Sequence, residues 1–342
     1  MTSPIIPPRI TVALCVYDNA PYLGAALDSL LAQSFSDFEL LVVDDGSTDG
    51  SSTIIADYVR RDSRIHAYHQ PNLGLIAGLN RIIGMARGEY IARMDGDDIA
   101  LPERFARQVA FLDAHPDHGV VGTQFLGITE TGTTRRDQPL ARPLSAEAVA
   151  AALPQGSPLC HPSVMMRRDL VRAVGGYRVA YRHCEDYDLW LRLSERTRMA
   201  NLPERLLLYR YSTTQVSHRH ALAQHYGAAV AQRAHATRVE GHPDPSETWQ
   251  ELPPIDLLDA AFGRPGQARA VRAAMTRAML YDLPSLSGDG LPLIAAHLAD
   301  TRDSPDERCP GLWRTVVRLA RYYHPLAALR LAMFLIRDSI GR

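Results

Sequence analysis

Three carboxylates, Asp95, Asp97 and Asp98, stand within four residues of one another, directly after a short apolar run at 90–94. The run predicts a β-strand, and Pro102 predicts the first turn of a helix, where a missing N–H costs nothing. Carboxylates this close repel one another unless a cation lies between them. Mg²⁺ or Mn²⁺ supplies that charge and shares its coordination shell with substrate phosphates. The alternative is an acidic turn before a helix N-terminus, where Asp is favoured in any case.

A second acidic cluster, Glu185, Asp186 and Asp188, opens the segment 185–193. Apolar residues at 189, 190 and 193 have helical spacing and should face the core. Glu185 and Asp186 should therefore lie at the N-terminus of a helix and point into a cleft. The alternative is that all three acids are there because the helix dipole favours them.

The first hundred residues alternate between apolar runs and amphipathic helical patterns. Strands are expected at 10–16, 38–43, 65–69 and 90–94, with helices between them. Such alternation with short links predicts right-handed crossovers and a mainly parallel twisted sheet flanked by helices, which is an α/β fold. Asp44 and Asp45 follow the second strand as Asp95 follows the fourth, so both clusters should lie at the edge where such sheets bind ligands. Neither a G-x-G-x-x-G nor a P-loop motif is present, which excludes those two nucleotide sites.

Composition narrows the function classes. A length of 342 residues predicts two or three compact units. A net charge of −1 gives no general attraction to nucleic acid, and the chain contains no lysine. The four cysteines form no C-x-x-C pair and indicate free thiols of a reducing compartment. No signal peptide is expected from the first residues, and no stretch reaches the 18 or so apolar residues of a membrane span.

Three stretches, 11–51, 72–98 and 183–193, together resemble the family 2 glycosyltransferases of the GT-A fold. The first contains V-D-D-G-S-T-D, the second ends in M-D-G-D-D, and the third begins H-C-E-D-Y-D. The resemblance extends over roughly residues 8–220 and includes several independent motifs in the right order. It implies an enzyme that uses a nucleotide-sugar donor, inverts the anomeric centre and depends on a divalent cation, Mn²⁺ or Mg²⁺.

The resemblance also implies roles for the donor-side residues. Cys15 and Tyr17 occupy positions that contact a uracil base, and Asp45 matches the carboxylate that accepts a hydrogen bond from the base. Asp97 would bind the metal that bridges the diphosphate, and Asp95 would approach the ribose or the metal shell. The alternatives are a core aromatic for Tyr17 and an Asx-turn residue for Asp45.

On the acceptor side, Asp186 matches the family's general base, which deprotonates the acceptor hydroxyl as it attacks the sugar. Glu185 would orient the site. Arg210 and His218, near a polar loop after an expected strand at 206–211, are candidates for a phosphate contact or, for His218, a third metal ligand. A histidine in a loop is more often a surface residue, so that alternative stays open for His218.

Beyond residue 220 the resemblance fades and a helical C-terminal region is expected. The segments 312–323 and 326–336 combine arginines with interfacial aromatic residues, a composition that suits a helix on an anionic membrane surface. The alternatives are a helical cap on the catalytic domain and a dimer contact. The family often extends lipid-linked oligosaccharides at the cytoplasmic face, which implies a cytoplasmic enzyme with a possible peripheral contact through 312–337.

These observations predict three parts: a nucleotide-sugar-binding half at 1–100, an acceptor-binding half at 101–220, and a helical region at 221–342. The resemblance to family 2 glycosyltransferases implies a reaction that moves a sugar from a UDP-linked donor to a hydroxyl of a growing glycan, in bacterial surface polysaccharide synthesis. Two other classes are a sugar nucleotidyltransferase and a non-catalytic glycan-binding module. The first usually has a Gly-rich basic loop after its first strand, where this chain has Y-D-N-A-P-Y-L, and the second would not need Asp186.

Overall fold

The structure, a computed structural model, describes residues 7–212, 220–280, 282, 285–286, 290–302, 309–322 and 324–340. The chain divides into two compact units. The first comprises Met1–Arg178 and Glu185–Ser212, and the second comprises Val179–Cys184 and Thr213–Arg342. All the acidic motifs described above lie in the first unit, so this unit by itself positions the candidate site.

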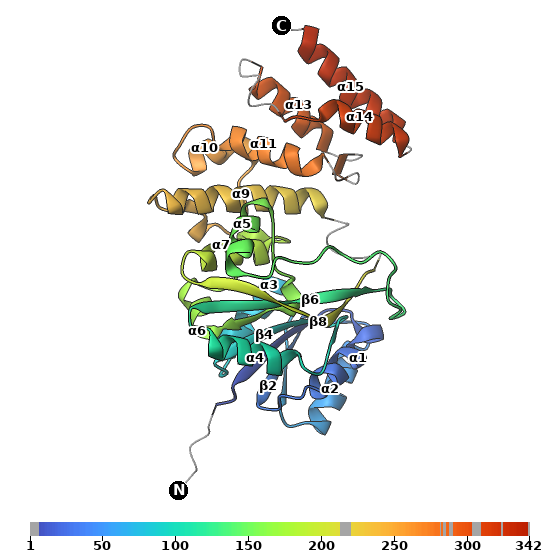
Figure 1. Cartoon of the computed structure of the whole chain (residues 1–342), viewed down its shortest axis with the longest axis vertical. Helices are drawn as coiled ribbons and strands as arrows, with labels where there is room; N and C mark the ends of the chain where they lie inside the picture. The colour runs from blue at the N-terminus through green and yellow to red at the C-terminus, as the bar shows by residue number, and fades with distance from the viewer. Residues whose placement is uncertain are drawn as a thin grey trace. The chain divides into compact units, whose positions relative to one another are not determined.

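The first unit is built on one eight-stranded sheet of order β3-β2-β1-β4-β7-β6-β8-β5 (Figure 1). Its strands are β1 (Ile10–Val16), β2 (Phe38–Asp44), β3 (Ile65–His69), β4 (Tyr90–Asp95), β5 (Ile99–Ala100), β6 (His118–Ile128), β7 (Met165–Arg167) and β8 (Arg198–Arg210). The first four strands pair in parallel, as the strand–helix alternation predicts. The second half is mixed, because β7 runs antiparallel to both of its neighbours while β6 and β8 are parallel.

Helices cover both faces of the parallel half. They are α1 (Ala20–Leu31), α2 (Ser51–Arg61), α3 (Leu75–Met85) and α4 (Arg104–Ala114). Alternate residues of β1, such as Val12 and Leu14, share one core with α1, α2 and α4. Cys15 points to the other face, where α3 packs so closely that a Cβ on Gly78 would lie 2.7 Å from the Cys15 sulfur. A strand buried on both faces must be apolar at nearly every position, and β1 and β2 have that pattern.

Two local expectations are corrected. The apolar composition of 159–166 predicts a β-like segment, but the structure has a 3₁₀ turn there, His161–Ser163, followed by the short β7, because Pro162 removes a ladder donor. Gly88, after a helical pattern at 72–87, is expected to be a C-cap, but α3 ends at Met85 with Ala86 as its cap. Gly88 is required for close packing instead: a Cβ there would lie 2.4 Å from the backbone nitrogen of Thr11 in β1.

Three further α-helices belong to the first unit. They are α5 (Ala146–Ala152), α6 (Arg168–Ala173) and α7 (Glu185–Ser194). Apolar residues of α7 are buried as predicted, with Leu189, Trp190 and Leu193 all fully inaccessible. Since these residues anchor one face of α7 in the core, the acidic first turn of the helix is held in a fixed place.

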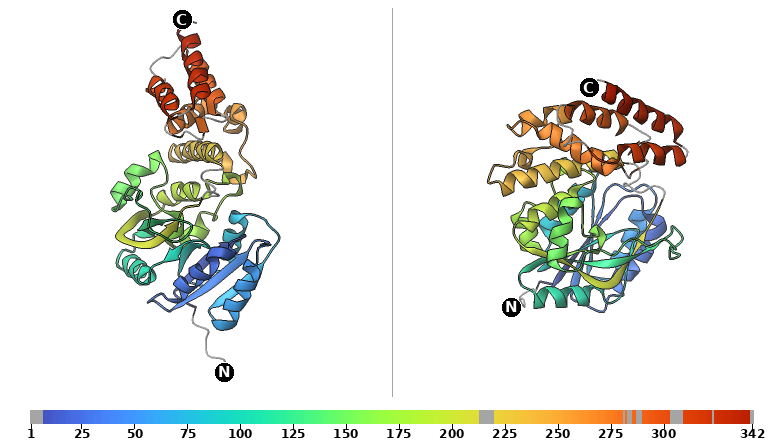
Figure 2. Two further views of the ribbon diagram at one scale, coloured as in Figure 1. Left: turned by 90° about the vertical axis from the view of Figure 1, so that its right-hand side faces the viewer. Right: turned by 45° about the horizontal axis from the view of Figure 1, so that its top comes forward.

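The second unit is helical, with α9 (Ala221–Val239), α10 (Leu258–Ala261), α11 (Gln267–Met279), α13 (Gly290–Asp300), α14 (Leu312–Arg321) and α15 (Pro325–Ile340). The longer helices pack in succession, α9 on α11, α11 on α13, α13 on α15 and α15 on α14 (Figure 2). Among the described residues, none of these helices combines the length and the hydropathy that crossing a membrane requires.

Candidate active site

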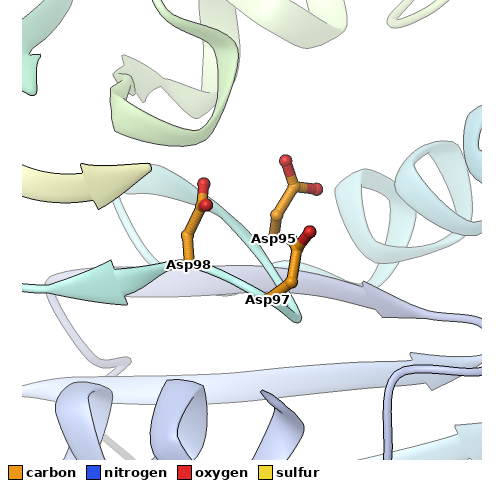
Figure 3. Close-up of side chains that lie close together, drawn as sticks. All are labelled: Asp95, Asp97 and Asp98. Atoms are coloured by element: carbon orange, nitrogen blue, oxygen red, sulfur yellow. The ribbon is translucent and has the colours of Figure 1, made fainter. Parts of the chain in front are cut away.

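The acidic triplet lies where β4 ends. Cys15 of β1 is the register partner of Asp95, so the triplet begins beside the carboxyl end of the central strand pair. The carboxylates of Asp95, Asp97 and Asp98 point to the same side of the chain (Figure 3). Their ligand atoms lie within 4.8 Å of one another. Three oxygen donors on one side of a tight turn are therefore available to a single ion.

The electrostatics of the triplet fit a divalent cation. Burial and the Asp95 charge raise the pKa of Asp97 to about 6, and burial and the neighbouring carboxylates raise the pKa of Asp98 well above its usual range. Asp98 is 1% exposed, and its Oδ2 has no hydrogen-bond partner among the described residues. Mutual repulsion and an orphaned buried oxygen are both relieved by a hard cation, and carboxylates are the ligands that Mg²⁺ and Mn²⁺ prefer.

A buried arginine, Arg93, lies beside the triplet. Its side chain is 4% exposed and forms an ion pair with Asp95. Burial opposes its charge, but Asp95 and then Asp98 outweigh burial and raise the pKa of Arg93. Its charge also lowers the pKa values of Glu185 and Asp186 at the start of α7. Arg93 is therefore paired with one acidic cluster and its charge also acts on the other.

The first turn of α7 presents the second acid pair. Burial and the Asp186 charge raise the pKa of Glu185 to about 7, and burial raises the pKa of Asp186. Asp186 is half-buried, and its Oδ2 accepts a long hydrogen bond from the Ser157 hydroxyl at 3.5 Å. Asp188, one turn deeper, is paired with Arg192 at 2.6 Å and is structural. A carboxylate with a raised pKa is a better proton acceptor, so Glu185 and Asp186 are the candidates for acid–base chemistry.

Buried Tyr177 and half-buried His161 form a hydrogen-bonded pair. The His161 Nε2 and the Tyr177 hydroxyl are 2.7 Å apart. Burial raises the pKa of Tyr177, which Arg93, Asp186 and Glu185 also influence. Asn80 of α3 accepts from the Tyr177 backbone N–H and donates to its carbonyl, at 2.8 and 2.7 Å. These two hydrogen bonds fix the position of the Tyr177 backbone.

On the predicted donor side, Tyr17 follows β1 and its ring is 49% exposed, so it can stack on a ligand. Cys15 is half-buried, and burial raises the pKa of its thiol to about 12, so it stays protonated. The Asp45 carboxylate accepts from the Gln70 side chain and from the backbone N–H groups of Leu73 and Gly74, at 2.7 to 2.9 Å. Asp45 therefore positions the turn before α3.

Arg210 is the last residue of β8 and stabilises the acidic turn through hydrogen bonds. Its guanidinium donates to the carbonyls of Asp97, Thr129 and Glu130 at 2.7 to 3.1 Å, and its backbone N–H donates to Asp98. It is 5% exposed. Arg210 thus places a fixed positive charge beside the triplet, and its predicted phosphate contact stays a prediction. His218 lies outside the described residues.

The amino-acid sequence is similar to those of known glycosyltransferases. The sequence model of the family "Glycosyl transferase family 2" matches residues 11–175. A Bacillus subtilis protein named as a glycosyltransferase, EpsE, is 38% identical over 192 residues, which is 55% of this chain and 67% of that protein. The O-antigen biosynthesis glycosyltransferase WbnJ of Escherichia coli is 33% identical over 208 residues, 59% of this chain and 79% of WbnJ. The chain belongs to glycosyltransferase family 2.

Solved structures share the fold of this family 2 glycosyltransferase. A structure of S. aureus TarS 1-349 with UDP-GlcNAc has a TM-score of 0.59 at 15% identity, covering 98% of this chain and 92% of that one. The mannosyltransferase PcManGT from Pyrobaculum calidifontis, with GDP-Man and Mn²⁺, has a TM-score of 0.56 at 19% identity, covering 99% and 89%. At these identities the similarity establishes the GT-A-type fold.

Two features of this glycosyltransferase were not predicted from its motifs. The run at 90–94 predicts an apolar strand, yet it contains Arg93, and a charge in a strand buried on both faces is itself a signal of a buried partner. His161, a histidine in a loop, has the same surface alternative as His218, but it is half-buried and its Nε2 lies 2.7 Å from the Tyr177 hydroxyl. Neither Pro162 nor the sequence G-G-Y at 175–177 indicates that the two residues meet, because they are 16 positions apart.

Proposed function

We propose that this glycosyltransferase moves one sugar from a nucleotide-diphosphate donor, UDP-linked, to a hydroxyl of a growing glycan with inversion at the anomeric carbon. One observation carries the proposal: buried Arg93 forms an ion pair with Asp95 of the acidic triplet, and its charge also lowers the pKa values of Glu185 and Asp186. A reaction that expels a diphosphate and deprotonates a hydroxyl needs these two acidic groups within one site.

The donor side is supported by the end of β1 and the turn after β2. Tyr17 offers an exposed ring for stacking on a base. Asp45 accepts three hydrogen bonds, and a carboxylate has about four acceptor positions, so one remains for a base N–H. UDP-GlcNAc bound to TarS and GDP-Man bound to PcManGT, two proteins of the same fold, support a nucleotide-diphosphate sugar as donor, and the choice of uridine is inferred from the resemblance at Cys15, Tyr17 and Asp45.

Asp95 and Asp97 would hold Mn²⁺ or Mg²⁺, with Asp98 behind them. When bound, the ion would supply positive charge to the departing diphosphate. The closely grouped oxygens of the triplet and the raised pKa values of Asp97 and Asp98 support this assignment. Mn²⁺ bound to PcManGT, which has the same fold, also supports it. Arg210 adds a fixed cation beside the same turn and stabilises its conformation through the Asp97 carbonyl.

Asp186 would act as the base. Its carboxylate accepts the proton of the acceptor hydroxyl while the hydroxyl oxygen forms a bond to C1 of the sugar and the bond from C1 to the diphosphate oxygen breaks. Attack from the face opposite the leaving group inverts C1. Glu185 orients the acceptor. Arg93 keeps both carboxylates more acidic than burial alone would allow, so they stay ionised nearer neutral pH.

The acceptor is a glycan or a lipid-linked oligosaccharide of a bacterial surface polysaccharide, modified on the cytoplasmic side of the membrane. WbnJ, an O-antigen biosynthesis glycosyltransferase that shares 33% of its residues with this chain over the aligned part, supports this setting.

Substituting Asp186→Asn tests the assignment. Transfer should fall by about 10²–10⁴-fold, the usual contribution of a positioned base, while donor binding is retained. Asp169→Asn, on the exposed start of α6, is the matched control and should leave turnover unchanged. If the Asp186 variant turns over as fast as the parent, Asp186 is not the base.

A thermal-shift screen tests the donor and the ion together. UDP, GDP, CDP and dTDP are each added with Mn²⁺, Mg²⁺ or a chelator, and binding raises the melting midpoint by mass action. We expect a metal-dependent shift with UDP that is lost in Asp97→Asn. A larger shift with another nucleotide would replace uridine in the proposal, and no shift with any of them would remove the nucleotide site.

A further inference from the structure

Exposed apolar side chains are concentrated at the C-terminal end of the second unit. Fifteen large apolar side chains are well exposed among the described residues, and seven of them belong to α14, α15 or the link between them. They are Trp313, Val317, Tyr322, Leu326, Leu329, Met333 and Ile336. Scattered exposed apolar residues need no explanation, but seven of them on or between two helices that pack on each other mark a candidate interaction site.

On α14 these residues form a stripe separate from the core face. Leu312 and Leu319 are buried, whereas Trp313 and Val317, one turn apart, are 53% and 67% exposed. Exposed Arg314 and Arg321 lie seven residues apart on the same side of the helix, next to that stripe. The helix therefore presents an apolar stripe bordered by arginines to the solvent.

The same pattern recurs on α15, which packs on α14 (Figure 2). Leu326, Leu329, Met333 and Ile336 follow the helical spacing of three and four and are 43% to 74% exposed. Arg330 and Arg337 are exposed and lie along one edge of this stripe. We name the exposed residues of α14 and α15, with Tyr322, the arginine-edged surface.

The charge of the arginine-edged surface has one sign. α14 contains no acidic residue. The only acid of α15 is Asp338, which is 8% exposed. Arg314, Arg321, Arg330 and Arg337 therefore dominate the electrostatic field over these two helices. A second copy of the chain is a poor occupant, because a two-fold contact would bring arginines of one copy toward those of the other.

We propose that the arginine-edged surface docks the enzyme on an anionic lipid bilayer, with α14 and α15 lying in the plane of the interface. Burying apolar side chains at the boundary of the acyl chains contributes favourable binding free energy, and the attraction of the neighbouring arginines to anionic headgroups adds to it. The pattern of an apolar stripe with cationic edges and no exposed acid is the one that such a surface requires. This inference concerns binding alone and stands independently of the reaction proposed above.

The test is co-sedimentation of the full chain with vesicles rich in phosphatidylglycerol, compared with phosphatidylcholine alone. Binding is expected only to the anionic vesicles and should weaken at high salt, because exposed charges are screened. Each arginine contributes about 1 kcal/mol of attraction to the vesicle, which is about a fivefold change in affinity. The triple variant with Arg314→Gln, Arg321→Gln and Arg330→Gln should therefore bind roughly a hundredfold more weakly.

The apolar half of the surface is tested by Val317→Ser with Leu329→Ser and Met333→Ser, which should weaken binding at least about tenfold. The matched control is Val239→Ser with Leu257→Ser. These side chains are 68% and 55% exposed in the same unit but outside α14 and α15, and their substitution should leave vesicle binding unchanged. Unchanged melting midpoints establish that the variants are folded.

Three results would overturn the proposal. The first is failure of the parent chain to bind anionic vesicles at low salt. The second is binding that neither triple variant weakens. The third is a dimer in sedimentation that the serine variant converts to monomer, with no vesicle binding, which would assign the surface to a second copy of the chain.

Discussion

Replacing Arg93 with methionine should destabilise the first unit, because it removes the cation that two acidic clusters share. The side chain is 4% exposed, and its partner Asp95 is 31% exposed. Breaking a fully buried ion pair by removing one partner costs about 3–5 kcal/mol. Because Asp95 is partly solvated, we expect about 2–3 kcal/mol here, which lowers the melting midpoint by roughly 4–12 °C.

The assay is thermal unfolding of Arg93→Met with a chelator present, beside two comparison variants. Arg93→Met combined with Asp95→Asn should recover part of the loss, since the second change removes the unpaired charge. Arg107→Met, which breaks only an exposed pair with Glu103, should stay within about 0.5 kcal/mol of the parent. Added Mn²⁺ should raise the midpoint of Arg93→Met more than that of the parent.

The reasoning is refuted if Arg93→Met has the same melting midpoint as the parent, or if the double variant is no more stable than Arg93→Met alone. A kinetic readout separates positioning from simple stability. Arg93 lowers the pKa values of Glu185 and Asp186, so its loss should move the acid limb of the activity profile to higher pH. A folded Arg93→Met enzyme with an unshifted profile would show that the guanidinium does not influence the base.

Further predictions concern stability. Glu185 has its pKa raised from 4.5 to about 7 and Asp186 has its pKa raised, so the folded chain binds protons more readily than the unfolded chain. Without metal, the melting midpoint should therefore fall as pH rises from about 4.5 to about 7, and Glu185→Gln should flatten that slope. A slope of the opposite sign in calorimetry would contradict this. Gly88→Ala should cost about 3 kcal/mol or more, because its Cβ would meet the β1 backbone at 2.4 Å. Gly84→Ala, a helical glycine with open space around it, is the control and should be neutral or stabilising by up to about 1 kcal/mol in chemical denaturation.

The sequence alone determined the parallel half of the fold. The expected strands at 10–16 and 65–69 coincide with β1 and β3, and the one at 38–43 ends one residue short of β2. Apolar runs of that length, separated by amphipathic helices, have few other ways to bury their surface. The family assignment was also made from sequence and is confirmed, because its motifs are short, local and ordered along the chain.

Only the tertiary structure decided which residues from distant parts of the chain interact. Arg93 and Glu185 are 92 positions apart, and no local pattern indicates that the guanidinium of one affects the carboxyl of the other. The antiparallel insertion of β7 between β4 and β6 was also beyond the pattern, because a three-residue strand has no periodicity to detect. Local propensity and spacing specify elements and their acidic ends, whereas the partners of a buried charge depend on which strands become neighbours.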